Sequence, residues 1–183
     1  MKNMFLLFCL MFSLNSNAQN FDQETWNKFH EKGDVDYKVD KNILGWIKVS
    51  THSSSTEESE MIMKHVEESI MSANIFFNRS GIKKCNKKNL MVFFIDDKIL
   101  NDQDLMSFLG WEKWNRLDIN GAYEGVYAPR KTGVIFISKT PSGKDIRQLI
   151  SHEIAHYWQD THCGLPISET SAWAFEKHYI ENK

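Results

Sequence analysis

Two histidines and a glutamate near the C-terminal end of the sequence have the types and spacing needed to bind and use a metal ion. The pattern H-E-x-x-H is formed by His152-Glu153-Ile154-Ala155-His156. On a helix, residues four apart lie one turn above each other, so both imidazoles can bind one ion, typically zinc. The carboxylate of Glu153 would lie beside that ion and could take a proton from a bound water. The alternative is a surface helix that carries these residues by coincidence.

The residues around this pattern predict a helix with one packed face. A periodic segment runs from about Lys144 to Asp160 and follows a turn at residues 140–143. One side of the helix is expected to be a core face, made of Ile146, Ile150, Ile154 and Tyr157. The two histidines and the glutamate fall on the adjoining stripe. Such a helix would support a metal site rigidly without burying its open coordination position.

A catalytic zinc ion usually has three protein ligands and one water, so a third ligand is expected after His156. Glu169 is the first candidate. Gly164 and Pro166 interrupt the chain before it, and Ser168 can cap a second helix. In the first turn of a helix that packs antiparallel to the motif helix, a glutamate would point back at the two histidines. We therefore expect Glu169 to be the third ligand.

His162 is the second candidate for the third ligand. Its position resembles the metzincin signature H-E-x-x-H-x-x-G-x-x-H, but Gln159 replaces the glycine at which the metzincin chain turns sharply. Metzincins also have a methionine turn downstream, whereas the last methionine of this chain is Met106. A site that uses neither Glu169 nor His162 is the remaining alternative.

The stretch from about Tyr123 to Glu176 resembles the gluzincins, zinc metallopeptidases with H-E-x-x-H on one helix and a glutamate ligand on a later helix. The likeness rests on the five-residue pattern, on Glu169, on the Leu-Pro turn before it and on the alanine three residues after it. Some gluzincins have an aspartate four residues after this glutamate to hold a zinc histidine, but Trp173 stands there. Glu176 or Asp160 could replace it, although we expect both to be solvated surface charges.

The resemblance implies hydrolysis of peptide bonds in a peptide or protein substrate. Zn²⁺ would be held by His152, His156 and Glu169, and Glu153 would be the general base toward the bound water. Family members often add a donor to the oxyanion, and the candidates here are Tyr123, Tyr127, Tyr157 and His178. A non-catalytic exported zinc-binding protein on the same scaffold is the alternative, because only about 27 residues follow His156.

The order of the expected elements indicates an α+β fold. Strands are expected at residues 43–49, 90–95 and 133–138, and further helices at about 56–78 and 104–117. The first of these helices would bury Ile62, Val66, Ile70, Ala73 and Phe77. The resemblance implies a zincin-like upper lobe, in which a twisted mixed sheet lies over the motif helix and a C-terminal glutamate helix follows. Residues 123–128 would be its edge strand near the site, or an ordinary hairpin arm.

The N-terminal residues are typical of an export signal. Lys2 precedes an apolar stretch at residues 5–14, and residues 16–18 fit a small-residue cleavage site. We expect residues 1–18 to be a signal peptide and residues 19–183 to form a single domain, with no stable membrane anchor after cleavage. The polar start of that domain, up to Asp40, would be a helix or strap. The protein is therefore expected to be periplasmic or secreted.

Two cysteines would remain after cleavage, Cys85 and Cys163. An oxidising compartment would permit a disulfide between them, which would fix the loop between the motif helix and Glu169. Zinc ligation by Cys163 and a pair of free thiols are the alternatives.

The charge balance gives no indication of a nucleic-acid partner. Lysine and arginine number 22 against 24 aspartates and glutamates. The short cluster of lysines at residues 83–88 fits a solvated turn between a helix and a strand.

Overall fold

The computed structural model describes residues 35–78, 89–96, 100, 124–128, 133–139, 141, 145–161 and 166–182, together with residues 27 and 31. Tertiary contacts divide the chain into a unit of Met1–Asp34 and a unit of Val35–Lys183. The second unit contains β1 (Tyr37–Ile43), β2 (Ile47–Ser53), α3 (Thr56–Asn78), β3 (Asn89–Ile95), β4 (Gly125–Tyr127), β5 (Val134–Ser138), α6 (Ile146–Thr161) and α7 (Glu169–Glu181). In the described part of the chain, no helix is both long and apolar enough to cross a bilayer.

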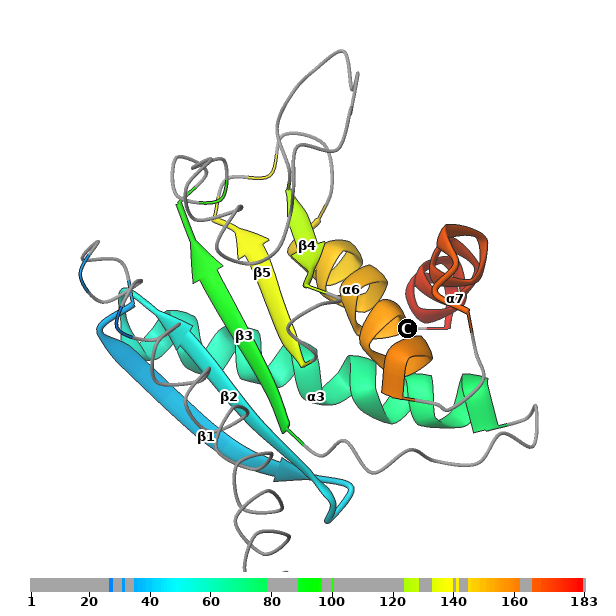
Figure 1. Cartoon of the computed structure of the whole chain (residues 1–183), viewed down its shortest axis with the longest axis horizontal. Helices are drawn as coiled ribbons and strands as arrows, with labels where there is room; N and C mark the ends of the chain where they lie inside the picture. The colour runs from blue at the N-terminus through cyan, green and yellow to red at the C-terminus, as the bar shows by residue number, and fades with distance from the viewer. Residues whose placement is uncertain are drawn as a thin grey trace, which may run out of the picture. The chain divides into compact units, whose positions relative to one another are not determined.

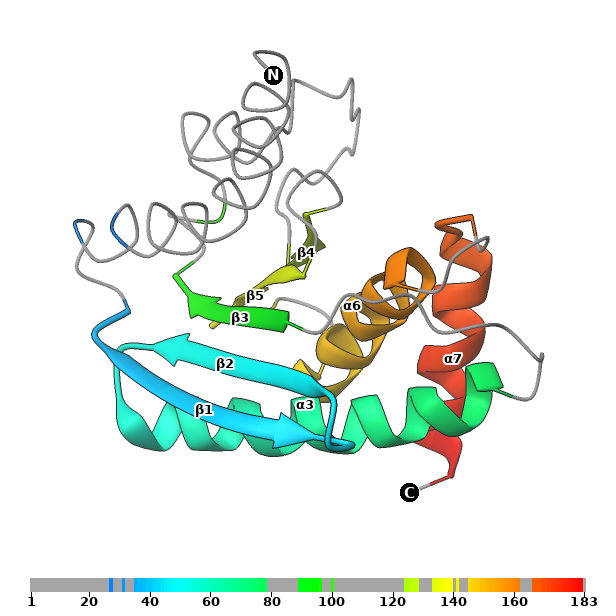
Figure 2. The same ribbon diagram turned by 60° about the horizontal axis from the view of Figure 1, so that its bottom comes forward.

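The five strands form one mixed sheet with the order β1-β2-β3-β5-β4 (Figure 1). The three central strands are parallel, whereas β1 pairs antiparallel with β2 and β4 pairs antiparallel with β5. Helices α3 and α6 cover one face of this sheet, and α7 packs against α6 (Figure 2). The expected α+β class is confirmed. The short strand β4 ends the sheet on the side where α6 lies.

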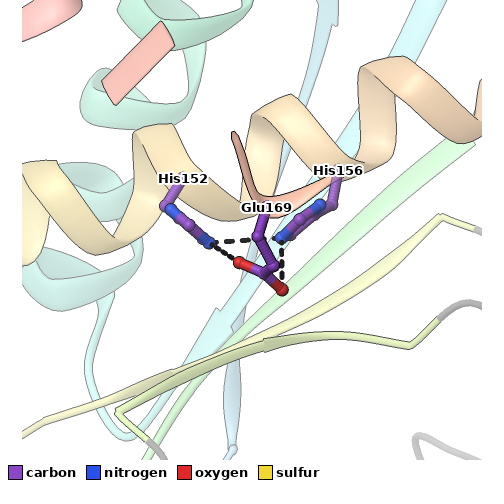
Figure 3. A group of neighbouring side chains, drawn as sticks. All are labelled: His152, His156 and Glu169. Carbon is purple, nitrogen blue, oxygen red and sulfur yellow. Dashed lines mark hydrogen bonds and ion pairs between the residues drawn. The ribbon is translucent and has the colours of Figure 1, made fainter. Parts of the chain in front are cut away.

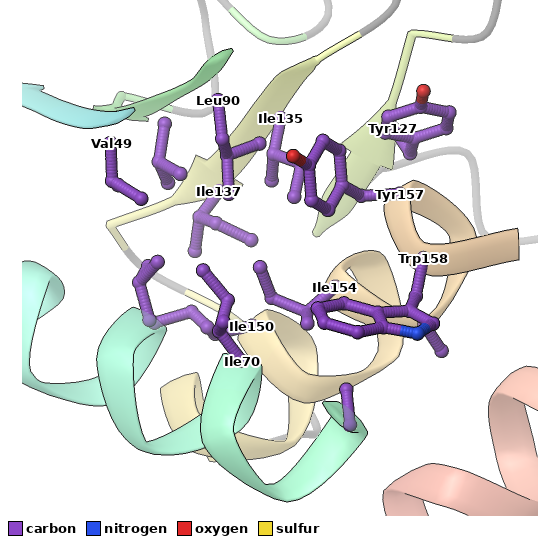
Figure 4. Close-up of a cluster of buried hydrophobic side chains, with 14 of the residues drawn as sticks. Val49, Ile70, Leu90, Tyr127, Ile135, Ile137, Ile150, Ile154, Tyr157 and Trp158 are labelled. Carbon is purple, nitrogen blue, oxygen red and sulfur yellow. The ribbon is translucent and has the colours of Figure 1, made fainter. Parts of the chain in front are cut away.

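A continuous apolar core joins the sheet to α3 and α6 (Figure 4). The expected face of α3 is confirmed, because Ile62, Val66, Ile70, Ala73 and Phe77 are all buried. On α6, Ile150, Ile154 and Tyr157 are buried as expected, whereas Ile146 at the start of the helix is only partly buried. Each large apolar side chain buried in this way contributes about 1.5–3 kcal/mol. The buried face therefore fixes the rotation of α6 about its own axis, and with it the direction of the adjoining stripe that carries His152 and His156.

The single strand expected at residues 43–49 is wrong, because the chain forms a hairpin there. Strand β1 ends at Ile43 and β2 begins at Ile47. Three residues, 44–46, separate the strands, and Leu44 and Gly45 have φ angles of 55° and 71°, as the centre of a type I′ turn requires. Glycine adopts such angles without strain, but leucine rarely does, so the apolar run concealed the turn. The pairing of β1 also places residues 37–40 in a strand instead of the expected helix or strap.

The other expected strands and helices are found within a few residues of their predicted ends. The helix expected at residues 104–117 lies outside the described residues. Tyr123, Cys85, His162 and Cys163 lie outside them as well.

We predict that His52 makes the folded state sensitive to acid. Its imidazole is buried on β2 and stacks on Phe93, with 4.7 Å between ring centroids. Burial, with a smaller effect of Lys38, lowers its pKa from 6.5 to about 4. Between these two values the unfolded chain binds a proton that the folded chain does not, so stability falls as the pH drops through this window.

The corresponding measurement is the free energy of unfolding in urea, at pH 7 and at pH 4.5, with chelator present. Wild type should lose about 2–3 kcal/mol more than His52→Phe between these two conditions. Because the other histidines are unchanged in the variant, the difference isolates His52. Equal losses in the two proteins would contradict the prediction.

Candidate metal centre

Helices α6 and α7 bring His152, His156 and Glu169 together (Figure 3). The two Nε2 atoms of the histidines are 3.2 Å apart. One oxygen of Glu169 lies 3.1 Å from Nε2 of His152, and its other oxygen lies 3.5 Å from Nε2 of His156. The two imidazoles are buried, whereas the carboxylate is exposed. The residues expected to be ligands therefore form a group that could bind a metal ion from the solvent side.

The separations between these atoms fit a shared ion. Ligand atoms at the usual 2.0–2.2 Å from zinc, arranged tetrahedrally, would lie about 3.4 Å from one another. The three measured separations are 3.1, 3.2 and 3.5 Å. The two Nε2 atoms and the two oxygens of Glu169 can all act as electron-pair donors, so a shared cation would stabilise this group. The donor set of two imidazoles and one carboxylate is that of many catalytic zinc sites.

Local sequence explains why Glu169 begins its helix. Ser168 is the N-cap, with extended backbone angles (φ −141°, ψ 120°), and its Oγ accepts a hydrogen bond from the backbone N–H of Ser171. Its carbonyl oxygen accepts the first helical hydrogen bond, from Ala172. Glu169 is then the first residue of α7, where the helix dipole favours a negative charge. The expected cap is confirmed.

The expectation that Glu176 is a solvated surface charge is wrong. Its Oε2 lies 3.1 Å from Nδ1 of His152, and its side chain is only 14% exposed. Seven residues along a helix bring a side chain back to within about 20° of its starting direction, so Glu176 shares the face of Glu169. Trp173, at the position of the gluzincin aspartate, is 58% exposed instead. A carboxylate on Nδ1 orients a metal-binding imidazole and fixes its tautomer.

Asp160 also differs from the expected surface charge, because its Oδ2 accepts a hydrogen bond from the hydroxyl of Tyr127. The same hydroxyl accepts a bond from the backbone N–H of Gly133. Burial, together with Asp160, raises the pKa of Tyr127 far above its usual range. This bond links strand β4 to the end of α6, so it holds the edge strand beside the helix that carries the histidines.

Two further candidate oxyanion donors pack against other aromatic side chains. Tyr157 lies in the core, edge-on to Tyr127, and burial raises its pKa (Figure 4). His178 packs against Phe76 of α3, nine residues after Glu169, which is about 13 Å along the helix. The assignment of the oxyanion donor stays a prediction.

Glu153 lies where the edge strand approaches α6. Its side chain is buried, with 6% of the residue exposed. A Cβ atom added to Gly125 of β4 would lie only 3.2 Å from Oε1 of Glu153 and 3.3 Å from its Cγ. Gly125 therefore permits the backbone of the edge strand to lie against this carboxylate, as expected for a glycine inside a strand. One helix thus presents a buried carboxylate and two candidate metal ligands beside a sheet edge.

No protein-family model matches the sequence, and neither does any curated protein. The interpretation of the centre therefore rests on its own chemistry. Two residues of that chemistry, Glu176 and Gln159, were missed as parts of the site from the sequence. Their spacing was the available signal, since Glu176 is two helical turns after Glu169 and Gln159 is one turn after His156.

We predict that Glu176→Ala weakens binding of zinc about 10–100-fold, because the ring of His152 loses the carboxylate that orients it. Dissociation constants would be measured by competition with a chromophoric chelator. Glu181→Ala is the matched control, since Glu181 lies on the same helix and forms an exposed ion pair with Lys177. Equal affinities of the two variants would show that Glu176 does not support zinc binding by His152.

Proposed function

We propose that this protein is a zinc-dependent peptidase with a gluzincin-like active site. The observation that carries the proposal is the position of Glu153. A site that only binds metal has no need of a further buried carboxylate, yet Glu153 directly follows the candidate ligand His152 and lies against Gly125 of the edge strand. A base at that position is what metal-assisted hydrolysis requires.

Zinc is the metal that best suits the donor atoms. Magnesium and calcium prefer sites made of oxygen ligands only, whereas two imidazole nitrogens with one carboxylate suit zinc. Three protein ligands leave one coordination position for water or substrate. The carboxylate of Glu169 is exposed, which supports a fourth position that solvent can reach. These features support a catalytic centre over a closed structural one.

The proposed chemistry assigns a task to each residue. Bound Zn²⁺ supplies a Lewis acid, which makes a coordinated water more acidic and polarises a carbonyl. Glu153 accepts the proton of the attacking water and later passes it to the leaving amine. His152, His156 and Glu169 hold the ion, and Glu176 holds the ring of His152. An extended peptide would pair with the outer edge of β4, since main-chain bonding at a sheet edge recognises peptides of many sequences.

The fold supports the proposal at a coarser level. A mixed sheet that packs on a helix with the H-E-x-x-H pattern, followed by a helix that begins with a glutamate, is the arrangement of a zincin-like upper lobe. Export to the periplasm or beyond is part of the same proposal. It rests on the signal-like N-terminal residues, which lie outside the described part of the chain.

The test is incubation of the untagged protein with a mixed peptide library, near neutral pH, followed by mass spectrometry. We expect cleavage that a zinc chelator abolishes and that added Zn²⁺ restores. Zinc bound at one ion per chain without any cleavage would support the non-catalytic alternative. A chain that binds no metal would contradict both functions.

A further inference from the structure

Gln159 contacts both halves of the metal centre. It lies on α6, one turn after His156, and only 1% of the residue is exposed. Its Oε1 is 3.3 Å from Nδ1 of His156. The same amide group bonds the backbone of Ser168, the residue directly before Glu169. A single buried side chain therefore reaches one ligand directly and the neighbour of another ligand on a separate helix.

The contacts with Ser168 determine which way the amide of Gln159 faces. The backbone N–H of Ser168 donates to Oε1 over 2.9 Å, and Nε2 donates to the carbonyl oxygen of Ser168 over 3.1 Å. If the amide were flipped, its NH₂ group would face the N–H of Ser168 and its oxygen would face the carbonyl oxygen of Ser168. Only the observed orientation therefore allows both hydrogen bonds. The oxygen of the amide is therefore the atom that faces His156.

This orientation selects one tautomer of His156. An amide oxygen can only accept, so Nδ1 of the imidazole must carry the proton that makes the bond. In the neutral ring, Nε2 then has its lone pair, and Nε2 is the atom that faces His152 and Glu169. Glu176 imposes the same tautomer on His152. The two histidines are thus prepared by different groups, a carboxylate for one and a neutral amide for the other.

We propose that Gln159 is a positioning residue that couples the two helices of the metal centre, holding His156 in the Nδ1–H tautomer and fixing the turn from which Glu169 projects. The coupling to metal rests on the proposed zinc centre, whereas the tautomer is a property of the metal-free protein. Ser168 is also the N-cap of α7. Its side chain sets the start of the helix while Gln159 holds its backbone, so Glu169 is restrained from both directions.

Two variants separate this role from ordinary packing. Gln159→Met has nearly the same shape but lacks the amide, whereas Gln159→Glu keeps an acceptor for both His156 and the N–H of Ser168. The first readout is ¹⁵N NMR of the imidazoles in the metal-free protein, at a pH where they are neutral. We expect the Nδ1–H tautomer for His156 in wild type and in Gln159→Glu, and a mixture in Gln159→Met. An Nε2–H tautomer in wild type would overturn the proposal without any variant.

The second readout is the affinity for Zn²⁺. We expect Gln159→Met to bind about 10–100-fold more weakly than wild type, and Gln159→Glu to recover most of the loss. In a Glu169→Ala background the effect of Gln159→Met should shrink, because the part that acts through the turn before Glu169 no longer matters. An equal loss in both backgrounds would overturn the coupling.

The two readouts also separate this proposal from the proposed function. If wild type binds no zinc, the proposed function fails, and an unchanged His156 tautomer in Gln159→Met would overturn the role of Gln159 as well. If wild type binds zinc and Gln159→Met binds it equally well, only the role of Gln159 is overturned.

Discussion

Replacing Glu169 with alanine should lower the affinity for zinc by more than the roughly 10–100-fold expected when only a supporting residue of a metal ligand is removed. The reason is that Glu169 supplies the one anionic donor of the group, with its two oxygens 3.1 and 3.5 Å from the two Nε2 atoms. Without it, two imidazoles on consecutive turns of α6 would hold the ion alone. Zinc sites in proteins ordinarily need at least three protein ligands.

Two further variants make this result specific. His162→Ala should leave the affinity unchanged, because Gln159 does not turn the chain as a glycine would and α6 continues to Thr161. Glu181→Ala, on the exposed end of the same helix as Glu169, should also leave the affinity for zinc unchanged. Dissociation constants from chelator competition, with metal content measured on each purified protein, compare the four chains. Loss of zinc in His162→Ala, with retention in Glu169→Ala, would assign the third ligand to His162 instead.

Most of the candidate ligand group could be predicted from the sequence because all but one of the steps depended on local rules. The spacing of His152 and His156 needs only the period of a helix, and the cap at Ser168 needs only the chemistry of a helix start. The apolar face of α6, with Ile150 and Ile154, follows from the same period. Bringing α7 against α6 was the one long-range step, and it was inferred from a family resemblance.

The residues around the ligands could not be predicted in the same way, because their surroundings come from other elements. The sequence does not distinguish Glu176 from a solvated glutamate, because its partner His152 lies on a different helix. Gln159 was interpreted only as a departure from a glycine, although its amide has a partner nine residues away. The hairpin at Leu44 could not be predicted for a different reason. Leucine rarely adopts a positive φ angle, so its presence in an apolar run did not indicate a turn.

Replacing Glu153 with glutamine should abolish most peptide cleavage while zinc remains bound. The amide has the shape of the carboxylate, so it should keep the packing against Gly125, where a Cβ atom would come within 3.2 Å of Oε1. It cannot accept a proton from water, however. Loss of a general base typically costs about 10²–10⁴-fold in rate. The measurement is kcat/KM on a peptide that the library identifies, with Glu181→Gln as the matched control.

The separation of zinc affinity from rate decides what Glu153 does. Glu153 is not one of the three candidate ligands, so zinc affinity and content should match wild type in the Gln variant. If cleavage falls and zinc stays, the carboxylate acts on the reacting atoms and not through the metal ligands. Full activity in Glu153→Gln would refute the proposed mechanism, and loss of zinc would make Glu153 part of the metal centre. A buried carboxylate beside a sheet edge and a metal site is therefore the feature by which the peptidase proposal stands or fails.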